Sequence, residues 1–286
     1  VNIDLYPELN SYKVKGTYTL VNKTSTGISE ILIYVSDEIK MNSLESAKLT
    51  LVRSDVDFKQ YFFKANDVMQ PGDSINMNFD FEYKIEPLNG HESFNAIVEN
   101  GAFMRISNYF PRIGYNSDFE IDDKNEREIR NMSPADSLVK PDAPLDDPYN
   151  YEFINFDALI STSSDQTAVS AGVLTETFSK DNRNYFHYKV NDIPFRFAVS
   201  SAEYEIKKSH HKSIDIEVLY HPDHHQNTDH LIEQIIKTLD YCENNFGKYP
   251  YGSIRFAEIS SFTRGFAATA YPACIFINEK FLHLNL

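Results

Sequence analysis

Histidines gathered in one short stretch are the first candidates for chemistry, and six are found there: His210, His211, His221, His224, His225 and His230. A zinc site of the H-E-x-x-H type places two histidines four residues apart on a helix, and its glutamate polarises a metal-bound water. His221 and His225 have this spacing, but Pro222 stands in the position of that glutamate. We therefore expect these histidines to be exposed loop residues, with an adventitious metal site as the alternative.

Other reactive side chains give no stronger signal. The sequence contains no H-E-x-x-H, no G-x-S-x-G and no glycine-rich phosphate loop. Cys274 precedes the apolar run Ile275–Ile277, which predicts a buried thiol rather than a nucleophile. Cys242 is the only other cysteine in the sequence, so a disulfide framework is excluded.

Composition and charge narrow the class of protein. The chain has 286 residues, enough for two domains, and 42% of them are hydrophobic, which argues against global disorder. The 27 Lys and Arg stand against 42 Asp and Glu, a net charge of −15. Such a chain has no broad electrostatic attraction for nucleic acid, so we expect no nucleic-acid partner. No apolar run reaches the roughly 20 residues that span a bilayer.

The elements that must position any site are mostly strands. Residues 12–20 and 75–83 alternate apolar and polar side chains, and residues 31–35 form a short apolar run. We therefore predict a mainly β fold, with a large antiparallel β-sandwich or saddle-like domain over residues 1–205. The acidic, proline-containing stretch 117–148 interrupts it and is predicted to be a surface loop, with one short helix over 122–132.

Further strands are predicted at 151–160, 168–174, 185–190, 195–199 and 214–220, followed at last by a helix. One face of this helix carries Ile232, Ile235, Ile236, Leu239, Cys242 and Phe246. Asn227 or Thr228 supplies an N-cap and Gly247 a C-terminal stop. Two strands are expected after the helix in the sequence, at 255–259 and 275–277. Residues 206–286 are thus predicted to form an incomplete α+β domain.

This order of segments, with the block Phe246-Gly247-Lys248-Tyr249-Pro250-Tyr251, resembles the aminopeptidase N-like zinc metallopeptidases, the gluzincin aminopeptidases. The segment 108–116 is similar to a bacterial subset associated with membrane transporter-like segments. The resemblance implies that 1–205 is the family's β-rich amino-terminal domain and 206–286 the start of its thermolysin-like peptidase domain. It also implies a peptide substrate, the rest of a catalytic domain and transporter-like segments as partners, and an extracytoplasmic location, periplasmic or membrane-tethered, in a bacterium.

The family's G-A/G-M-E-N signature supplies a glutamate that holds the free amino terminus of the substrate. The aligned positions here are Ala268, Thr269, Ala270 and Tyr271, and the resemblance implies that they bind substrate, with Ala270 in place of the glutamate. A cationic amine then loses a charge-assisted hydrogen bond of about 1.5–3 kcal/mol. The segment could still bind an extended peptide as a sheet edge. The alternative is a plain turn leading into the strand that contains Ile275.

The family's zinc ligands follow this signature by some tens of residues, and the sequence contains no such motif; His283, followed by Leu284, does not begin one. We therefore expect no catalytic residue and no zinc in this chain, and zinc in a longer parent peptidase of which it is the front part. A non-catalytic peptide- or protein-interaction module with the same fold is the alternative, and a free-standing glycan-binding β-sandwich is a third. Apolar surface near the carboxyl end is expected to promote self-association.

Overall fold

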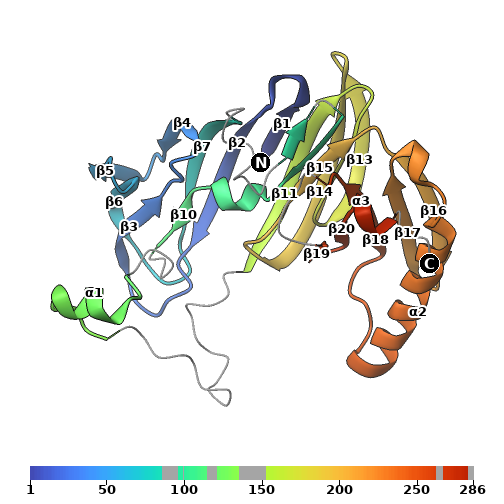
Figure 1. The fold of residues 1–286 in the computed structure, drawn as a ribbon. Helices are drawn as coiled ribbons and strands as arrows, with labels where there is room; N and C mark the ends of the chain where they lie inside the picture. The colour runs from blue at the N-terminus through green and yellow to red at the C-terminus, as the bar shows by residue number, and fades with distance from the viewer. Residues whose placement is uncertain (86–95, 99, 115–120, 135–152, 262–266, 283–286) are drawn as a thin grey trace.

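The computed structural model describes residues 1–85, 96–98, 100–114, 121–134, 153–261 and 267–282. Four β-sheets account for most of this part of the chain, and we name them sheets A to D. Figure 1 shows sheets A to C as one wide β structure, with sheet D and its helix at one end and a short helix projecting at the other. The predicted mainly β fold with an α+β segment after it is confirmed, although one strand pair of the large region, Asn2–Asp4 beside Leu159–Ser161, is parallel and not antiparallel.

Sheet A has seven strands and is the largest of the four sheets described. Its strands, in spatial order, are β13 (Val173–Lys180), β14 (Arg183–Pro194), β11 (Phe153–Ser163), β1 (Asn2–Tyr6), β2 (Ser11–Val21), β7 (Ser74–Lys84) and β4 (Lys40–Glu45). The pairing of β2 with β7 is antiparallel and continuous from Ser11 opposite Lys84 to Val21 opposite Ser74. Both strands show the alternation read from the sequence, which places one face of the sheet against the core.

Sheets B and C cover parts of sheet A and have four strands each. Sheet B is β10 (Arg112–Ile113), β3 (Ile28–Tyr34), β6 (Gln60–Met69) and β5 (Leu49–Asp55). Sheet C is β12 (Thr167–Ser170), β15 (Val199–Ala202), β9 (Gly101–Met104) and β8 (Ala96–Val98). The short 3-10 helices η1 (Pro7–Leu9) and η2 (Ile106–Tyr109) follow β1 and β9.

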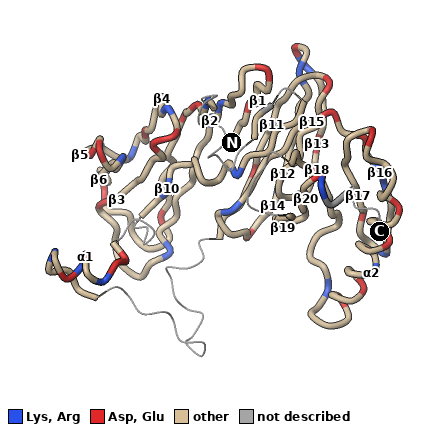
Figure 2. Tube along the Cα trace, in the orientation of Figure 1, with Lys and Arg blue, Asp and Glu red and all other residues tan. Residues whose placement is uncertain are grey.

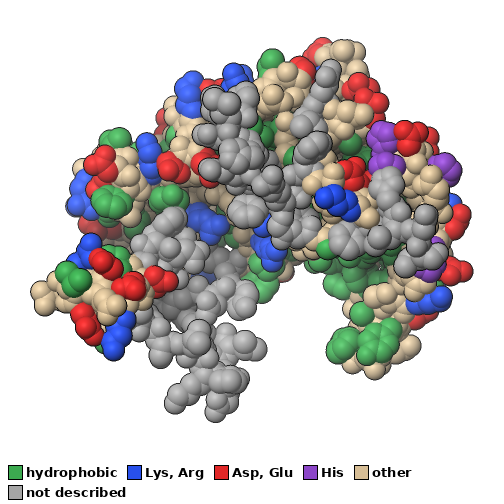
Figure 3. Space-filling view, viewed as in Figure 1, with side chains coloured by type: hydrophobic (Ala, Val, Ile, Leu, Met, Phe, Trp, Pro, Cys, Tyr) green, Lys and Arg blue, Asp and Glu red, His purple; other side chains and the backbone are tan. Residues whose placement is uncertain are grey.

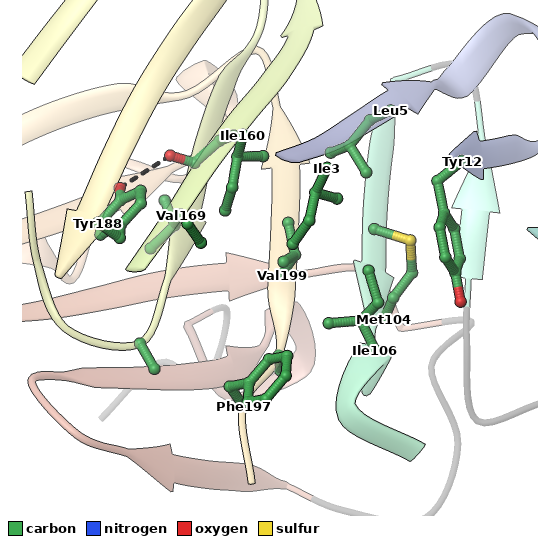
Figure 4. Packing of buried hydrophobic residues seen from close by; sticks show 14 of the residues in the cluster. Ile3, Leu5, Tyr12, Met104, Ile106, Ile160, Val169, Tyr188, Phe197 and Val199 are labelled. Atoms are coloured by element: carbon green, nitrogen blue, oxygen red, sulfur yellow. Dashed lines mark hydrogen bonds between the residues drawn. The ribbon is translucent and has the colours of Figure 1, made fainter. Parts of the chain in front are cut away.

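The main core lies between sheets A and C and is rich in aromatic rings (Figure 4). Ile3 and Tyr12 of sheet A and Met104 and Val199 of sheet C are all fully buried there. The Tyr188 hydroxyl donates to the Ala168 carbonyl oxygen at 2.9 Å, which satisfies a polar group inside the core. A second cluster, between sheet B and β7, buries apolar residues that include Ile33, Phe63 and Met77.

Sheet D contains the regions where candidate chemistry is found. Its strands, in spatial order, are β16 (Glu205–His211), β17 (Ile214–Tyr220), β18 (Ser253–Ile259), β20 (Cys274–Asn278) and β19 (Ala268–Tyr271). β17, β18 and β20 run parallel, whereas β16 and β19 are antiparallel edge strands. Helix α2 (Thr228–Phe246) packs on one face of the sheet, and the other face joins the main core.

Helix α2 begins and ends at the predicted residues, with Gly247 at φ 123° after its last turn. Asn227 occupies the N-cap position, but its side chain makes no capping hydrogen bond. The prediction for its apolar face is only partly right. Ile232, Ile235 and Leu239 are buried, but Cys242 is exposed and Phe246 is 80% exposed. Figure 3 shows hydrophobic side chains gathered at this end of α2, where the helix projects beyond its contacts with the sheet.

Two predicted strands differ from the structure. The run 168–174 is divided between β12 and β13 because Gly172 turns the chain at φ 94°, where a Cβ atom would lie 2.8 Å from the Lys189 carbonyl oxygen. The run 195–199 is strand only from Val199 onward. Pro194 ends β14, and Phe197 is buried on irregular backbone whose carbonyl oxygen accepts from Ser107 N at 3.3 Å.

The acidic stretch contains the expected short helix, α1 (Lys124–Ile129), capped by the Asp123 side chain, which accepts from Glu126 N at 2.9 Å. The rest of that predicted loop lies largely outside the described residues. Figure 2 shows acidic positions scattered over both ends of the traced chain, with Lys and Arg among them. Among the residues that the structure describes, no helix combines the length and apolar character needed to cross a membrane.

Candidate functional site

The four residues predicted to bind substrate form one strand. Ala268, Thr269, Ala270 and Tyr271 make up β19, the last strand of sheet D. β19 pairs antiparallel with β20 through a two-residue turn in which Ala273 adopts φ 58°. The plain-turn alternative is wrong for these four residues, because the turn is confined to Pro272 and Ala273.

The register of this hairpin decides which backbone groups are free. Asn278 N donates to the Ala267 carbonyl oxygen at 2.8 Å, so the backbone groups of Ala267 face β20. Thr269 and Tyr271 lie two and four residues further along, and their backbone groups face β20 as well. Because backbone groups alternate sides along a strand, the N–H and C=O groups of Ala268 and Ala270 point away from β20. Within the described ranges no other strand pairs with that side of β19. In the part of the chain that the structure describes, this side of β19 is therefore an open sheet edge.

The side chains of β19 divide in the same alternating way. Thr269 and Tyr271 are buried, whereas Ala268 and Ala270 are exposed. The Tyr271 ring packs edge-on against Phe276, with ring centroids 5.7 Å apart. The Arg196 guanidinium carbon lies 5.5 Å from the centroid of the same Tyr271 ring. Tyr271 therefore anchors the strand to the core, and only the two alanines leave room for a ligand.

The sheet that carries β19 is fastened to the large β region. Phe103 of sheet C and Phe276 of β20 lie 5.0 Å apart between ring centroids, and Gly172 N donates to the Pro272 carbonyl oxygen at 2.8 Å. Cys274 lies in this contact region and is buried as predicted, and burial raises the pKa of its thiol to about 12. The thiol is therefore neutral at physiological pH and is not a nucleophile.

A buried ion pair lies on the face of sheet D that packs against the main core. Arg255 Nε and Glu217 Oε2 are 2.8 Å apart, both side chains are largely inaccessible, and the guanidinium carbon lies 5.7 Å from the Tyr188 ring centroid. These contacts link β17 and β18 to sheet A. The edge strand is thus carried by a rigid frame rather than by a free loop.

The histidines require a correction. His225 and His230 are exposed as expected, but His210 and His211 belong to strand β16, and the His224 side chain is only 16% exposed. His224 ends the 3-10 helix η4 (Pro222–His224), which packs its imidazole against strand β18. Figure 3 shows the histidines gathered over the sheet D end of the molecule. The spacing of His221 and His225 therefore did not identify the relevant side chain.

His224 belongs to a group of three possible metal ligands. Its Nδ1 is hydrogen-bonded to Glu258 Oε1, and Glu279, at the start of helix α3 (Glu279–Leu282), completes the group. One ligand atom from each residue lies within 4.8 Å of the other two. Sequence reasoning missed both glutamates. Each glutamate lies at the carboxyl end of a strand: Glu258 is the next-to-last residue of β18, and Glu279 directly follows β20. The sequence could have shown this, but only the order of strands in the sheet shows that the two ends are neighbours.

Comparison with known proteins shows similarity at the level of structure alone. No family model and no curated protein sequence matches the chain. Among solved structures it is similar to a mutant M1 zinc metallopeptidase from Deinococcus radiodurans, with a TM-score of 0.66 at 10% identity over 98% of this chain. A two-domain M1 zinc metallopeptidase mutant bound to L-tryptophan gives a TM-score of 0.67 at 10% identity over 97% of this chain.

A third similar structure is the D. radiodurans mutant bound to a Tyr-Ser-Ala substrate, with a TM-score of 0.66 at 10% identity over 98% of this chain. This chain spans 59% of the length of each of the three neighbours. The shared feature is the fold of M1 zinc metallopeptidases, the aminopeptidase N-like enzymes of the predicted resemblance.

The zinc of these neighbours has no matching ligand set here. The 286 residues contain no H-E-x-x-H pair of histidines on a helix, and α2 contributes only His230, which is exposed. The residues present do not fit a catalytic zinc of that type, so we derive no step of peptide hydrolysis for this chain.

Proposed function

We propose that this chain is a peptide-recognition module with the fold of M1 zinc metallopeptidases, and that it binds extended peptides along the open edge of β19. The observation that carries the proposal is the edge itself. Ala268 and Ala270 direct backbone N–H and C=O groups away from β20, where no strand among the described residues pairs with them, and their side chains are small. An extended peptide can add to such an edge as a further strand.

The frame of β19 favours this mode of binding. Thr269 and Tyr271, which alternate with the two alanines, have buried side chains. The strand is therefore held in place before any peptide binds. A bound peptide would then gain main-chain hydrogen bonds without first ordering a loop. One similar structure contains a Tyr-Ser-Ala substrate, which makes this tripeptide a reasonable first probe.

The test removes one outward N–H. Proline at an edge position lacks the N–H but does not disturb bonds to the neighbouring strand, so Ala270→Pro should fold. We expect it to weaken binding of Tyr-Ser-Ala by about 1 kcal/mol, roughly fivefold, the value of one net hydrogen bond. Binding is followed by NMR titration of the labelled chain.

Ala270→Ser is the matched control because it changes the side chain and keeps the backbone donor. It should bind the tripeptide like the unchanged chain. Equal affinities of the proline and serine variants, or shift changes confined to residues away from β19, would overturn the edge as the binding site.

We further propose that catalysis, in a longer parent, would require a zinc-binding helix from residues beyond those present here. The alternative is a module that binds peptide or protein and performs no hydrolysis, and Ala270 at the position of the family's glutamate favours it. Zinc content and peptide cleavage of the parent separate the two. An extracytoplasmic location and transporter-like partners stay predictions from the resemblance.

A further inference from the structure

We propose that His224, Glu258 and Glu279 form a binding site for one divalent transition-metal ion. These residues come from three separate segments: η4, the end of β18 and the start of α3 directly after β20. Because β17, β18 and β20 are parallel, their carboxyl ends meet at one margin of sheet D. Ligand sites in sheets of parallel strands are found at this margin.

The geometry is near that of a bound ion. One ligand atom from each residue lies within 4.8 Å of the others. Ligands with bonds of about 2.1 Å around a tetrahedral zinc ion are about 3.4 Å apart, so the widest pair must close by no more than about 1.4 Å. Rotation of two glutamate side chains supplies a movement of that size. One imidazole and two carboxylates would then leave a fourth position for water.

Burial and charge also favour a cation. Glu258 is 5% exposed, and its charged partner in the described part of the chain is His224. A buried carboxylate is costly unless a positive charge lies close by. A divalent ion placed among these three side chains would bring two positive charges next to both carboxylates.

Backbone donors already orient the two carboxylates. His221 N donates to Glu258 Oε2 at 2.7 Å, and Ser261 N donates to Glu279 Oε1 at 2.7 Å. Each donor fixes one carboxylate oxygen and so orients the other, which is the role of outer hydrogen bonds around metal ligands. The Tyr204 hydroxyl holds the backbone at the same point by donating to the Glu258 carbonyl oxygen at 2.5 Å.

The donor set indicates which ions would bind. Imidazole suits Zn²⁺, Co²⁺ and Fe²⁺, whereas Mg²⁺ and Ca²⁺ prefer oxygen ligands alone. The site also lies on the sheet face that carries the exposed alanines of β19. Glu258, Ile277 and Ala268 are opposite one another across three strands, so about 10 Å separates Glu258 from Ala268 at two strand spacings.

The test measures binding of Zn²⁺ by calorimetry to the chelator-treated 286-residue chain, with Mg²⁺ in parallel. We expect one saturable Zn²⁺ site and no comparable Mg²⁺ binding. Co²⁺ should give visible absorption bands of a site with a nitrogen ligand. Glu258→Gln and Glu279→Gln should each weaken Zn²⁺ binding at least about tenfold, the smallest loss expected when even a supporting group is changed.

His225→Ala is the matched control, because His225 is the exposed neighbour of His224 and forms the i, i+4 pair with His221. It should leave Zn²⁺ binding unchanged. Glu279→Gln also serves as the folding control, because this side chain is only partly buried and should not alter the circular dichroism spectrum.

Three results would overturn the proposal. The first is no saturable Zn²⁺ binding by the unchanged chain. The second is full Zn²⁺ affinity in a folded Glu279→Gln variant. The third is a loss in His225→Ala equal to that in Glu258→Gln, which would assign the ion to surface histidines.

Discussion

The large β region and the sheet D region differ in the polar groups that they bury: the sheets of the first bury neutral side chains such as Thr162 and Ser201, whereas sheet D buries the charged Arg255 and Glu258. Sheets A and C bury an aromatic core, in which Phe79, Phe81, Phe110 and Phe197 form a chain of ring contacts. Sheet D buries apolar residues on both faces but leaves an open edge at β19 and a polar cluster at the ends of β18 and β20. The first region therefore acts as a frame, and the second carries both proposed binding sites.

The contact between the two regions holds the edge of β19 in place for peptide binding. A sheet edge binds a peptide well only if the edge does not have to be ordered first. Phe103 and Tyr188 on one side, and Phe276 and Arg255 on the other, hold sheet D against the core.

The largest effect is expected where the regions meet. Phe276 is fully buried between Phe103 and Tyr271, so Phe276→Ala removes contacts to both regions and leaves a cavity. We expect the free energy of unfolding to fall by about 3–5 kcal/mol, measured by urea denaturation. Exposed Leu9→Ala, in the frame alone, is the control and should cost well under 1 kcal/mol. A loss below 1 kcal/mol for Phe276→Ala would contradict a shared core.

A smaller gain is expected at the edge strand. Ala270→Glu places a carboxylate on the exposed face of β19, where the family resemblance has a glutamate. It should improve binding of a peptide with a free amino terminus by about 1.5–3 kcal/mol, roughly 10- to 150-fold, as a charge-assisted hydrogen bond does. The acetylated peptide should show no gain, and titration of both peptides checks this. An equal gain for the two would show that the amino terminus does not lie near Ala270.

Alkaline pH should weaken the contact between the regions through Cys274. Its thiol pKa is raised by burial from 9.0 to about 12, so the unfolded chain loses this proton first. Stability from this group is complete below pH 9 and falls as the pH rises from 9 to 12, by about 1.4 kcal/mol at pH 10.

Unfolding by urea at pH 7 and pH 10 tests this for the unchanged chain and for Cys274→Ala. The loss between the two pH values should be smaller in the alanine variant by that amount. Identical losses would mean that the thiol is not protected by the core.

The smallest effect on stability is expected at the free end of α2. Phe246 is 80% exposed and lies 6.2 Å from Tyr241 between ring centroids, so Phe246→Ser should change the free energy of unfolding by no more than about 0.5 kcal/mol. The same change should reduce self-association, because it removes apolar surface. Light scattering over a concentration series measures this, and unchanged association would assign it to another surface.

The sequence predicted those features that depend on local periodicity. The alternation in β2, β7 and β17 and the caps of α2 were sufficient to place these elements. It failed where the outcome depends on distant partners. The break at Gly172 follows from the close approach of Lys189, and the exposure of Phe246 follows from where sheet D ends under the helix.

The candidate sites show the same limit. That Ala268 to Tyr271 could form a sheet edge was predicted, but the free backbone groups required the register with β20. The cluster of His224, Glu258 and Glu279 depends on the order of parallel strands, which no short motif encodes. The domain boundary near residue 205 stays a prediction, although β16 begins there.

Amide hydrogen exchange in β19, with and without Tyr-Ser-Ala, is the most direct test of the central claim that this edge binds peptide. The amides of Thr269 and Tyr271 should be protected in both states, because they face β20. Those of Ala268 and Ala270 should exchange rapidly in the free chain and become protected when the peptide binds. Unchanged exchange at both alanines under saturating peptide would contradict the claim.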